Sequence, residues 1–233
     1  MEKIRILYIP YAGGSAQLCK SWKYYFNPNI EVYPIELAGR GTRFKDKFYS
    51  NINEAINDLL NSIITYVDEP YVIYGHSLGA LLTYELYYKI QEMGIPEPEY
   101  LFLSGCLPPN RSNKGRIICE LSDNEFLNEV MKFNGMEKEV LQNKDLMDIV
   151  LPILRADFRL LDMYQFIEKD TKINKDVSVL YGNDMNYEQM KGWGDLTNKS
   201  INYNYINGDH FFVKKNIEEV LKIVIEQINS YLS

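Results

Sequence analysis

Histidine and cysteine are both scarce in this sequence of 233 residues, which contains two histidines and three cysteines. A zinc cluster needs about four Cys or His ligands at short spacings, and Cys19, Cys106 and Cys119 do not have them. We therefore expect neither a metal nor a cofactor. An odd number of cysteines without a secretory signal is typical of reduced thiols. Residues 4–9 have the pattern of a strand and not of a signal sequence, so we expect a cytoplasmic protein.

Basic residues are outnumbered by acidic ones: 25 Lys and Arg stand against 32 Asp and Glu, which gives a net charge of −7. Binding to nucleic-acid phosphates requires a clustered excess of Lys and Arg. Long apolar runs are also missing from the sequence, since none approaches the about 20 residues that span a bilayer. These two features argue against nucleic acid and against a membrane as partners.

Short β-rich runs alternate with helical patterns along most of the chain. The helical patterns include an apolar stripe over 52–67, a helix from Leu78 to Gly94, and a final helix with a stripe over 217–228. The runs that we predict to be strands are 4–9, 31–35, 71–74, 100–104, 177–181 and 203–206. This alternation is typical of an α/β domain with a mostly parallel central sheet flanked by helices. The length suits a single domain over residues 1–233.

The stretch between Ser104 and Val177 breaks the alternation, because it contains no convincing strand. Ser122-Asp123-Asn124-Glu125 has the pattern of a capping box that begins a helix. A second helical stretch begins near Asp145, Pro152 should kink or split it, and a third covers about 158–164. The Met, Phe and Leu content predicts a helical lid insertion over approximately 115–170, above an apolar site. The alternative is a set of helices packed permanently on the core.

The strongest local signal is Gly75-His76-Ser77-Leu78-Gly79, which matches the Gly-x-Ser-x-Gly nucleophile elbow. The turn from strand to helix is so tight there that a Cβ atom at either glycine would clash. A predicted strand precedes the motif directly and a helical pattern follows it, which is the context that the elbow requires. We therefore predict the α/β-hydrolase fold, with Ser77 as the nucleophile.

A serine hydroxyl needs a base to remove its proton, and the chain offers two histidines. His76 is next to Ser77, and its side chain must leave the elbow in a different direction, so we predict that it is structural. His210 follows the last predicted strand and remains as the candidate base. The order serine, acid, histidine along the chain is that of α/β-hydrolases.

An acidic residue should orient the imidazole and stabilise its charged form. Asp184 lies just past the carboxyl end of the predicted strand 177–181, where sites in parallel sheets are built. Asp209 is adjacent to His210 and therefore badly placed to accept a hydrogen bond from its ring. We predict Asp184 as the acid and keep Asp195 as the reserve candidate.

The tetrahedral intermediate of acyl transfer needs hydrogen-bond donors for its oxyanion. One donor should be the backbone N–H of Leu78, the residue after the nucleophile. The other should come from the loop after the first strand, Pro10-Tyr11-Ala12-Gly13-Gly14, where small residues allow a close approach to the substrate. We choose the N–H of Ala12. The alternative for this loop is an ordinary glycine turn.

Together these motifs resemble the type II thioesterases of nonribosomal peptide and polyketide synthesis. The resemblance covers nearly the whole chain, and its motifs are Pro10–Gly14, Gly39-Arg40-Gly41-Thr42-Arg43, Gly75–Ala80, Pro108-Pro109, Leu151–Asp157, Leu180–Asp184 and Gly208–Phe212. Two positions depart from the family pattern. Ala38 stands where the family often has proline, and Asp209 stands where it often has a second glycine.

The resemblance implies hydrolysis of acyl groups from the phosphopantetheine thioester of an acyl or peptidyl carrier protein. In this family the reaction clears stalled or mis-primed carriers and sometimes releases products. It implies catalytic roles for Ser77, Asp184 and His210 and oxyanion roles for Ala12 and Leu78. We expect a monomer whose lid contacts the carrier protein.

Two other functions fit the sequence less well. A small-ester or lipid hydrolase of the same fold usually has a His-Gly-Gly-Gly oxyanion loop, which is absent here. A binding protein without catalytic activity should have lost a member of the triad, whereas Ser77, Asp184 and His210 are all present.

Overall fold

The computed structural model describes residues 3–111, 117–133 and 138–232. Its strands form one six-stranded sheet in the order β2-β1-β3-β4-β5-β6, and every neighbouring pair is parallel. The strands are β1 (Ile4–Ile9), β2 (Ile30–Pro34), β3 (Tyr71–His76), β4 (Tyr100–Ser104), β5 (Asp176–Tyr181) and β6 (Ile201–Tyr205). The predicted α/β fold is confirmed, and each predicted strand is present with ends within two residues of the prediction.

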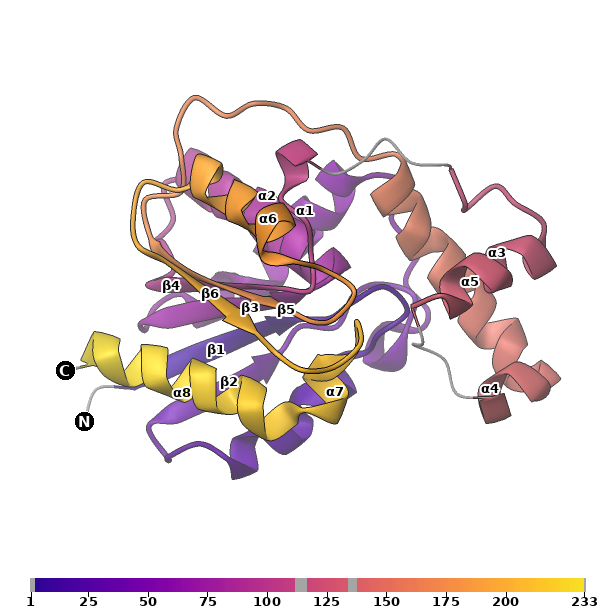
Figure 1. Cartoon of the computed structure of the whole chain (residues 1–233), viewed down its shortest axis with the longest axis horizontal. Helices are drawn as coiled ribbons and strands as arrows, with labels where there is room; N and C mark the ends of the chain where they lie inside the picture. The colour runs from indigo at the N-terminus through magenta and orange to yellow at the C-terminus, as the bar shows by residue number, and fades with distance from the viewer. Residues whose placement is uncertain (1–2, 112–116, 134–137, 233) are drawn as a thin grey trace.

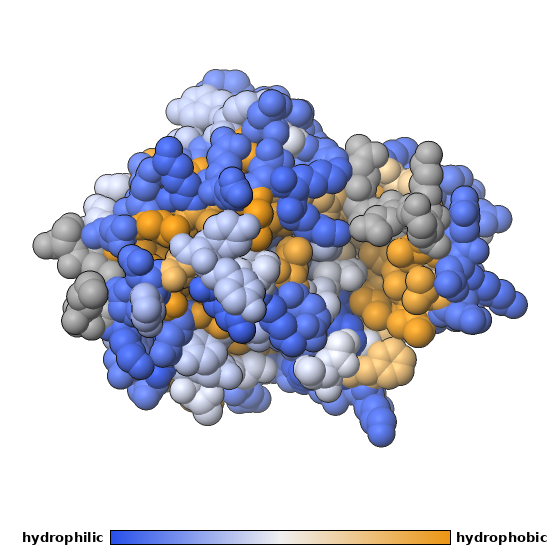
Figure 2. Space-filling view, turned by 90° about the horizontal axis from the view of Figure 1, so that it is seen from below, coloured by the Kyte–Doolittle hydropathy of each residue, from blue (hydrophilic) through white to orange (hydrophobic). Residues whose placement is uncertain are grey.

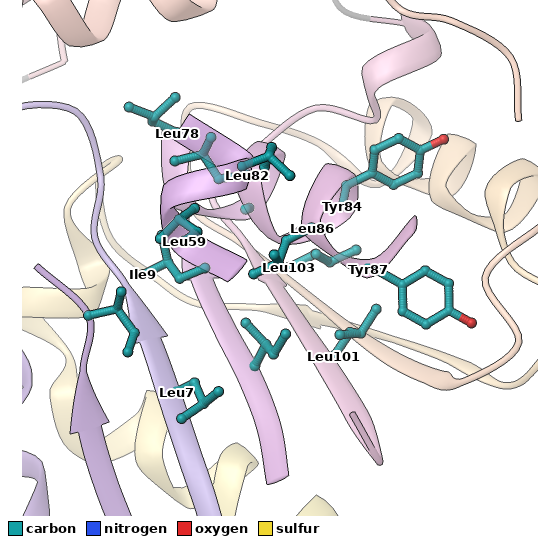
Figure 3. Packing of buried hydrophobic residues seen from close by; sticks show 14 of the residues in the cluster. Leu7, Ile9, Leu59, Leu78, Leu82, Tyr84, Leu86, Tyr87, Leu101 and Leu103 are labelled. Atoms are coloured by element: carbon teal, nitrogen blue, oxygen red, sulfur yellow. The ribbon is translucent and has the colours of Figure 1, made fainter. Parts of the chain in front are cut away.

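Both faces of the sheet are covered, because the central strands carry apolar side chains on each side. In β1, Leu7 and Ile9 point to the face that is covered by α1 (Ile52–Ile63) and α2 (Leu78–Glu92). Figure 3 shows side chains of α2, such as Leu82 and Leu86, above Leu101 and Leu103 of β4. This face forms the larger part of the core.

The opposite face of the sheet is covered by the C-terminal helix α8 (Ile217–Leu232) and by a 3₁₀ helix, η1 (Ala16–Tyr24). Figure 1 shows α8 below the sheet, with α1 and α2 above it. The sequence did not predict η1. Its buried residues Ala16, Cys19 and Trp22 recur every third position, which is the period of a 3₁₀ helix. The ring of Trp22 packs edge-on against Tyr8 and Tyr74, at 5.0 Å between ring centres in each case.

A helical insertion separates β4 from β5, although these strands are hydrogen-bonded neighbours. It consists of α3 (Asp123–Met131), α4 (Lys138–Gln142) and α5 (Lys144–Asp162), and it stands to one side of the sheet in Figure 1. The predicted capping box at Ser122 and Glu125 is present. Parts of the predicted range, 115–116 and 134–137, lie outside the described residues.

The sequence predicts that Pro152 kinks or splits the stretch that forms α5, and the split does not occur. Pro152 lies inside a single helix of 19 residues, and residues 158–162 continue that helix and do not begin a third one. A proline costs a helix one hydrogen bond, but here the turns on both sides of it are held by packing. Val150, Leu151, Leu154 and Phe158 belong to one apolar cluster with α3, which stabilises the helix across the proline.

The described residues contain no helix with the length and apolar character needed to cross a membrane. All three cysteines are free thiols. Within the same part of the chain, no group of three or more His, Cys, Asp or Glu side chains is arranged to hold a metal ion.

Candidate active site

Ser77 occupies the sharp turn between β3 and α2. Its backbone has φ 54° and ψ −116°, and it is the one residue other than glycine with positive φ among those described. Such a conformation is strained for a residue with a Cβ atom. The strain is held by the strand before it and the helix after it, and it presents the hydroxyl to the space above the carboxyl end of the sheet.

The two glycines of the elbow are needed for steric reasons, as the sequence predicted. A Cβ atom added to Gly75 would lie 2.2 Å from the carbonyl oxygen of Gly79 and 2.4 Å from Thr83 Oγ1. A Cβ atom added to Gly79 would lie 2.1 Å from the carbonyl oxygen of Ile9. The elbow is therefore packed directly on the loop that follows β1.

The structure brings the predicted serine, histidine and aspartate together, although they come from three separate loops. His210 Nε2 lies 3.0 Å from Ser77 Oγ, and His210 Nδ1 lies 2.9 Å from Asp184 Oδ2. His210 follows β6 and Asp184 follows β5, so parallel strands deliver both side chains to the edge of the sheet where β3 delivers the elbow.

Neither of the other two aspartates that the sequence analysis considered reaches His210. Asp195 Oδ2 accepts a hydrogen bond from Arg111 at 2.8 Å. Asp209 accepts one from the backbone N–H of Phe211 and pairs with Lys215 at 2.5 Å. Among the described residues, the carboxylate that meets the imidazole is therefore that of Asp184.

The two contacts of His210 determine which of its ring nitrogens carries the proton. A carboxylate accepts hydrogen bonds, so Nδ1 carries the proton and donates to Asp184, and Nε2 has a lone pair for the hydroxyl proton of Ser77. Burial acts to raise the pKa of Asp184, but its hydrogen bond and charge interaction with His210 outweigh burial and lower the pKa. Asp184 is thus held ionised, as an orienting carboxylate must be.

His76 is fully buried beside the site and belongs to a chain of hydrogen bonds. Its Nε2 lies 2.8 Å from the carbonyl oxygen of His210, and its Nδ1 lies 2.8 Å from Ser104 Oγ. The hydroxyl of Tyr74 donates to the same Ser104 oxygen at 3.0 Å. A carbonyl only accepts, so His76 donates from Nε2 and accepts from Ser104 at Nδ1. Burial, with repulsion from His210, lowers the pKa of His76 to about 3, which keeps the ring neutral.

The loop after β1 forms a tight turn that leaves one N–H available near the serine. The N–H of Gly14 donates to the carbonyl oxygen of Tyr11 at 2.8 Å, and Gly13 has φ 74°, as the third residue of a type II turn does. Within the described part of the chain, the N–H groups of Ala12 and Leu78 donate no hydrogen bond. Leu78 begins α2, where backbone donors lack helical partners.

A cavity of about 850 Å³ opens at Ser77 and His210 and extends between the core and the helical insertion. Its walls are mainly apolar, and the insertion contributes Val130 of α3, Phe133 just after α3, and Val150, Leu154, Phe158 and Leu161 of α5. The ring of Phe133 lies 5.4 Å from that of His210. The insertion therefore supplies much of the apolar wall of the cavity.

The outer surface of the insertion is also partly apolar. Figure 2 shows apolar side chains gathered at the right of the molecule, over this part of the chain. Leu146 and Ile149 of α5 are exposed apolar residues that do not line the cavity, whereas Ile117, Phe133 and Met163 are exposed but belong to its lining.

Comparisons with known proteins relate the chain to others in sequence and structure. A sequence model of the thioesterase domain family matches residues 5–228. The chain is 32% identical over 229 residues to linear gramicidin dehydrogenase LgrE of Brevibacillus parabrevis, covering 95% of this chain and 86% of that protein. It is 30% identical over 234 residues to gramicidin S biosynthesis protein GrsT of Aneurinibacillus migulanus, covering 99% and 91%. The crystal structure of ClbQ from the colibactin NRPS/PKS pathway superposes with a TM-score of 0.93 at 33% identity and covers 98% of both chains.

Proposed function

The chain belongs to the thioesterase family, and on this premise we propose that it hydrolyses acyl groups from phosphopantetheine thioesters of acyl or peptidyl carrier proteins in nonribosomal peptide or polyketide biosynthesis. The observation that supports a catalytic role is the pair of contacts that His210 makes, with Ser77 at 3.0 Å and with Asp184 at 2.9 Å. This is the geometry of a serine, a general base and the acid that orients the base.

The proposed reaction has two halves, acylation and hydrolysis. Ser77 Oγ attacks the thioester carbonyl while His210 Nε2 takes the hydroxyl proton. The tetrahedral intermediate collapses, the C–S bond breaks, and His210 returns the proton to the departing thiol of the pantetheine arm. Water then attacks the acyl-serine ester with His210 again as base, and the products are a free acid and Ser77.

Negative charge develops on the carbonyl oxygen in both halves of the reaction. The N–H groups of Ala12 and Leu78 are the donors that we propose for it, since both are unpaired within the described residues. Leu78 directly follows Ser77 at the start of α2, and Ala12 lines the cavity together with Ser77. Removing one such donor typically lowers the rate by about 10²–10³-fold.

The lining of the cavity favours an apolar acyl group, which is the part of the substrate that becomes bonded to the serine. It has about 850 Å³ and mainly aliphatic and aromatic walls, so a hydrocarbon chain gains about 0.8 kcal/mol for each methylene that it buries there. We infer that the helical insertion acts as the lid of this cavity, because Phe133 of the insertion packs over the ring of His210.

The carrier protein as partner is supported by the relatives. One is named for gramicidin S biosynthesis and another comes from the colibactin NRPS/PKS pathway. Such assembly lines hold their intermediates as thioesters of carrier-bound phosphopantetheine. The exposed apolar residues of the insertion, such as Leu146 and Ile149, are our candidate contact surface for the carrier.

The decisive experiment combines active-site labelling with turnover. A fluorophosphonate probe should label the wild-type chain at one residue and should not label Ser77→Ala. Ser77→Ala and His210→Ala should each lower kcat for an acyl-loaded carrier by on the order of 10⁶. Ser62→Ala is the matched control, because Ser62 lies on α1 and bonds only the carbonyl oxygen of Asp58 among the described residues. Equal labelling of Ser77→Ala and wild type would refute the assignment.

Product analysis and a choice of substrates separate this function from its alternatives. A free acid as product is expected, whereas an aldehyde or alcohol formed with consumption of a nicotinamide cofactor would indicate reduction, as the dehydrogenase name of one relative suggests for that protein. A kcat/KM for simple esters that clearly exceeds that for acyl-loaded carriers would favour an esterase. If the wild type is neither labelled nor active, the chain is a binding protein without catalytic activity.

A further inference from the structure

Two sequence motifs to which the proposed function assigns no role meet in a buried ion pair. Arg40 follows β2, and Asp157 lies on α5 of the helical insertion, 117 residues away. The guanidinium of Arg40 donates to both carboxylate oxygens of Asp157, at 2.5 and 2.6 Å. Arg40 is 3% exposed and Asp157 is 1% exposed. A bidentate contact of this kind is directional, and burial shields it from water.

This ion pair also holds the turn that carries the proposed oxyanion donor. Asp157 Oδ2 accepts a hydrogen bond from the backbone N–H of Gly13 at 2.7 Å. Arg40 donates to the carbonyl oxygen of Gly14 at 3.2 Å. Gly13 and Gly14 directly follow Ala12 along the chain. These two hydrogen bonds therefore fix the orientation of the peptide units that come after the proposed donor.

The helix that carries Asp157 rests directly on the same turn. A Cβ atom added to Gly13 would lie 2.4 Å from Leu154 Cδ2, and Leu154 precedes Asp157 by one turn of α5. Position 13 therefore requires glycine, both for its positive φ and because a side chain would clash with Leu154. The turn is confined between the elbow on one side and α5 on the other.

We propose that Asp157 is a positioning residue which, neutralised by Arg40, holds the turn at Ala12 in the orientation that stabilises the oxyanion. The proposal rests on the proposed function, because it assigns to Asp157 a role in that reaction. A carboxylate suits the role because it accepts from Gly13 and from Arg40 at once. An unpaired buried carboxylate would be costly, which explains why Arg40 accompanies it.

A consequence concerns the helical insertion. If α5 moved away from the core near Asp157, it would take the Gly13 hydrogen bond with it and leave two charges unpaired. The oxyanion turn is therefore ordered only while this part of α5 is seated, so catalysis is coupled to the position of the insertion.

The test uses a double variant, Arg40→Met with Asp157→Leu. Replacing both members of a buried ion pair by apolar residues is often neutral for stability, so the Tm should fall only by the cost of the backbone groups of Gly13 and Gly14 that lose their partners. The Gly13 N–H loses its partner, and a displaced catalytic group costs up to about 10²-fold. We expect kcat to fall about 100-fold with KM within about threefold. The affinity for a trifluoromethyl ketone, which forms a tetrahedral oxyanion on serine, should fall in parallel with kcat.

A single isosteric variant, Asp157→Asn, guards against failure of the double variant to fold. Its amide oxygen still accepts from Gly13, but its NH₂ group faces Arg40, so we expect a smaller loss in kcat, about tenfold, again without a matching rise in KM. Wild-type kcat and inhibitor affinity in either variant, once it is shown to be folded at the assay temperature, would overturn the proposal.

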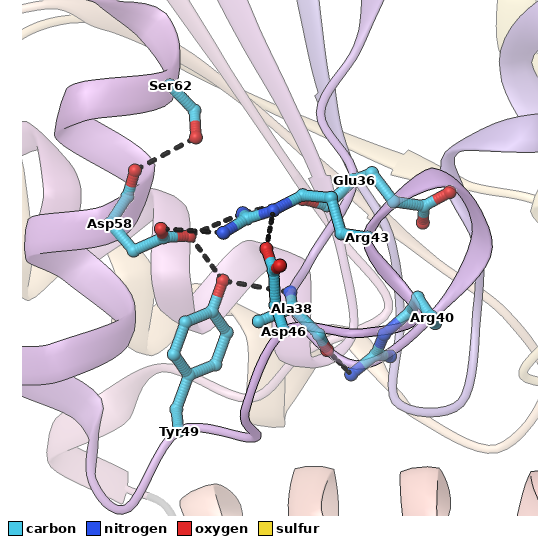
Figure 4. Close-up of polar contacts among 8 residues, drawn as sticks. All are labelled: Glu36, Ala38, Arg40, Arg43, Asp46, Tyr49, Asp58 and Ser62. Atoms are coloured by element: carbon cyan, nitrogen blue, oxygen red, sulfur yellow. Dashed lines mark hydrogen bonds and ion pairs between the residues drawn. The ribbon is translucent and has the colours of Figure 1, made fainter.

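Arg43→Met is the matched control for the loss of an Arg–Asp pair. Arg43 lies three residues after Arg40 and pairs with Asp58 of α1 through two contacts of 2.6 and 2.8 Å (Figure 4). We expect a lower Tm and an unchanged kcat. If the wild-type chain hydrolyses no acyl thioester, the proposed function itself fails; if it does and the Asp157 variants match it, only the positioning role fails.

Discussion

The side chain of His76 holds the main chain of His210, with 2.8 Å between the ring Nε2 of the first histidine and the carbonyl oxygen of the second. The two histidines of the chain thus have different tasks. His210 faces Ser77 and Asp184, whereas His76 is fully buried and continues a chain of hydrogen bonds from Tyr74 and Ser104. The main chain of the proposed general base is therefore held by a residue that does not line the cavity.

The His76 hydrogen bond can be tested with two substitutions. His76→Leu leaves the buried carbonyl oxygen of His210 without its donor and the buried hydroxyl of Ser104 without its acceptor. We expect it to lower the free energy of unfolding by about 2–3 kcal/mol and kcat by about 10–100-fold. His76→Gln keeps an amide donor and should retain more of both. Urea unfolding and steady-state kinetics measure the two effects, and equal kcat values for the Leu and Gln variants would contradict a positioning role.

The lowered pKa of His76 also predicts how stability changes with pH. A histidine titrates near 6.5 in the unfolded chain, whereas the pKa of His76 in the folded protein is about 3. Between these values the unfolded chain binds more protons than the folded one. The stabilisation is complete above pH 6.5 and is lost as the pH falls towards 3, with a slope of up to about 1.4 kcal/mol per pH unit.

The measurement for this pH effect is the free energy of urea unfolding between pH 5 and 7.5, where most carboxylates stay ionised. His76→Gln removes the titrating group, so its stability should change less over this range than that of the wild type. Parallel curves for wild type and variant would show that His76 does not titrate as described.

Asp184 is expected to affect the rate more than the fold. In Asp184→Asn, the amide NH₂ would donate to His210 Nδ1, which moves the ring proton to Nε2 and blocks acceptance of the Ser77 proton. We expect kcat to fall by up to about 10⁴-fold, measured with a saturating acyl thioester. Asp195→Asn is the control, since that carboxylate pairs with Arg111 at the surface. A similar loss in both variants would contradict the role of Asp184.

The glycines of the elbow allow a test of sterics at this turn. Gly75→Ala and Gly79→Ala each place a methyl group within 2.2 Å of a backbone carbonyl oxygen, and we expect each to lower the free energy of unfolding by about 3 kcal/mol or more. Gly94→Ala is the control, because Gly94 has φ 63° but nothing within 4 Å of its added Cβ. Gly94→Ala should lower the free energy of unfolding by only about 1–2 kcal/mol, which is the cost of a left-handed backbone conformation for alanine. Thermal denaturation compares the three.

The convergence of Ser77, Asp184 and His210 could be predicted from the sequence because each residue follows a recognisable strand. Parallel strands end at one edge of a sheet, so residues just past the strands at 71–76, 176–181 and 201–205 had to lie close together. The chain order of the three residues then assigned their roles. Local patterns were sufficient to predict this convergence, because the parallel sheet itself brings residues that are distant in sequence to the same edge.

The features that the sequence did not predict depend on packing between distant segments. The contact between Arg40 and Asp157 joins residues 117 positions apart. The sequence around either residue gives no indication of its partner. Pro152 lies inside α5 because the cluster around Leu154 holds the turns beside it, which overrides a local rule. The 3₁₀ helix that buries Trp22 is likewise set by its contacts with Tyr8 and Tyr74.

The cavity predicts a preference for acyl chain length, which one substitution on α5 should change. Val150 lines the cavity, and Val150→Phe adds bulk to its wall. Each methylene that the wild-type cavity buries should raise kcat/KM about fourfold, from about 0.8 kcal/mol, until the cavity is filled. With Val150→Phe this rise should stop at a shorter chain, while acetyl and propionyl thioesters should be cleaved as before.

The measurement is kcat/KM for a series of straight-chain acyl thioesters from two to twelve carbons. Ile149→Phe is the matched control, because Ile149 is the adjacent residue on the same helix but is 45% exposed. It should leave the chain-length profile unchanged. A profile that shifts equally in both variants would mean that bulk on α5 acts through the insertion as a whole, whereas a shift confined to Val150→Phe would place the acyl chain against that wall of the cavity.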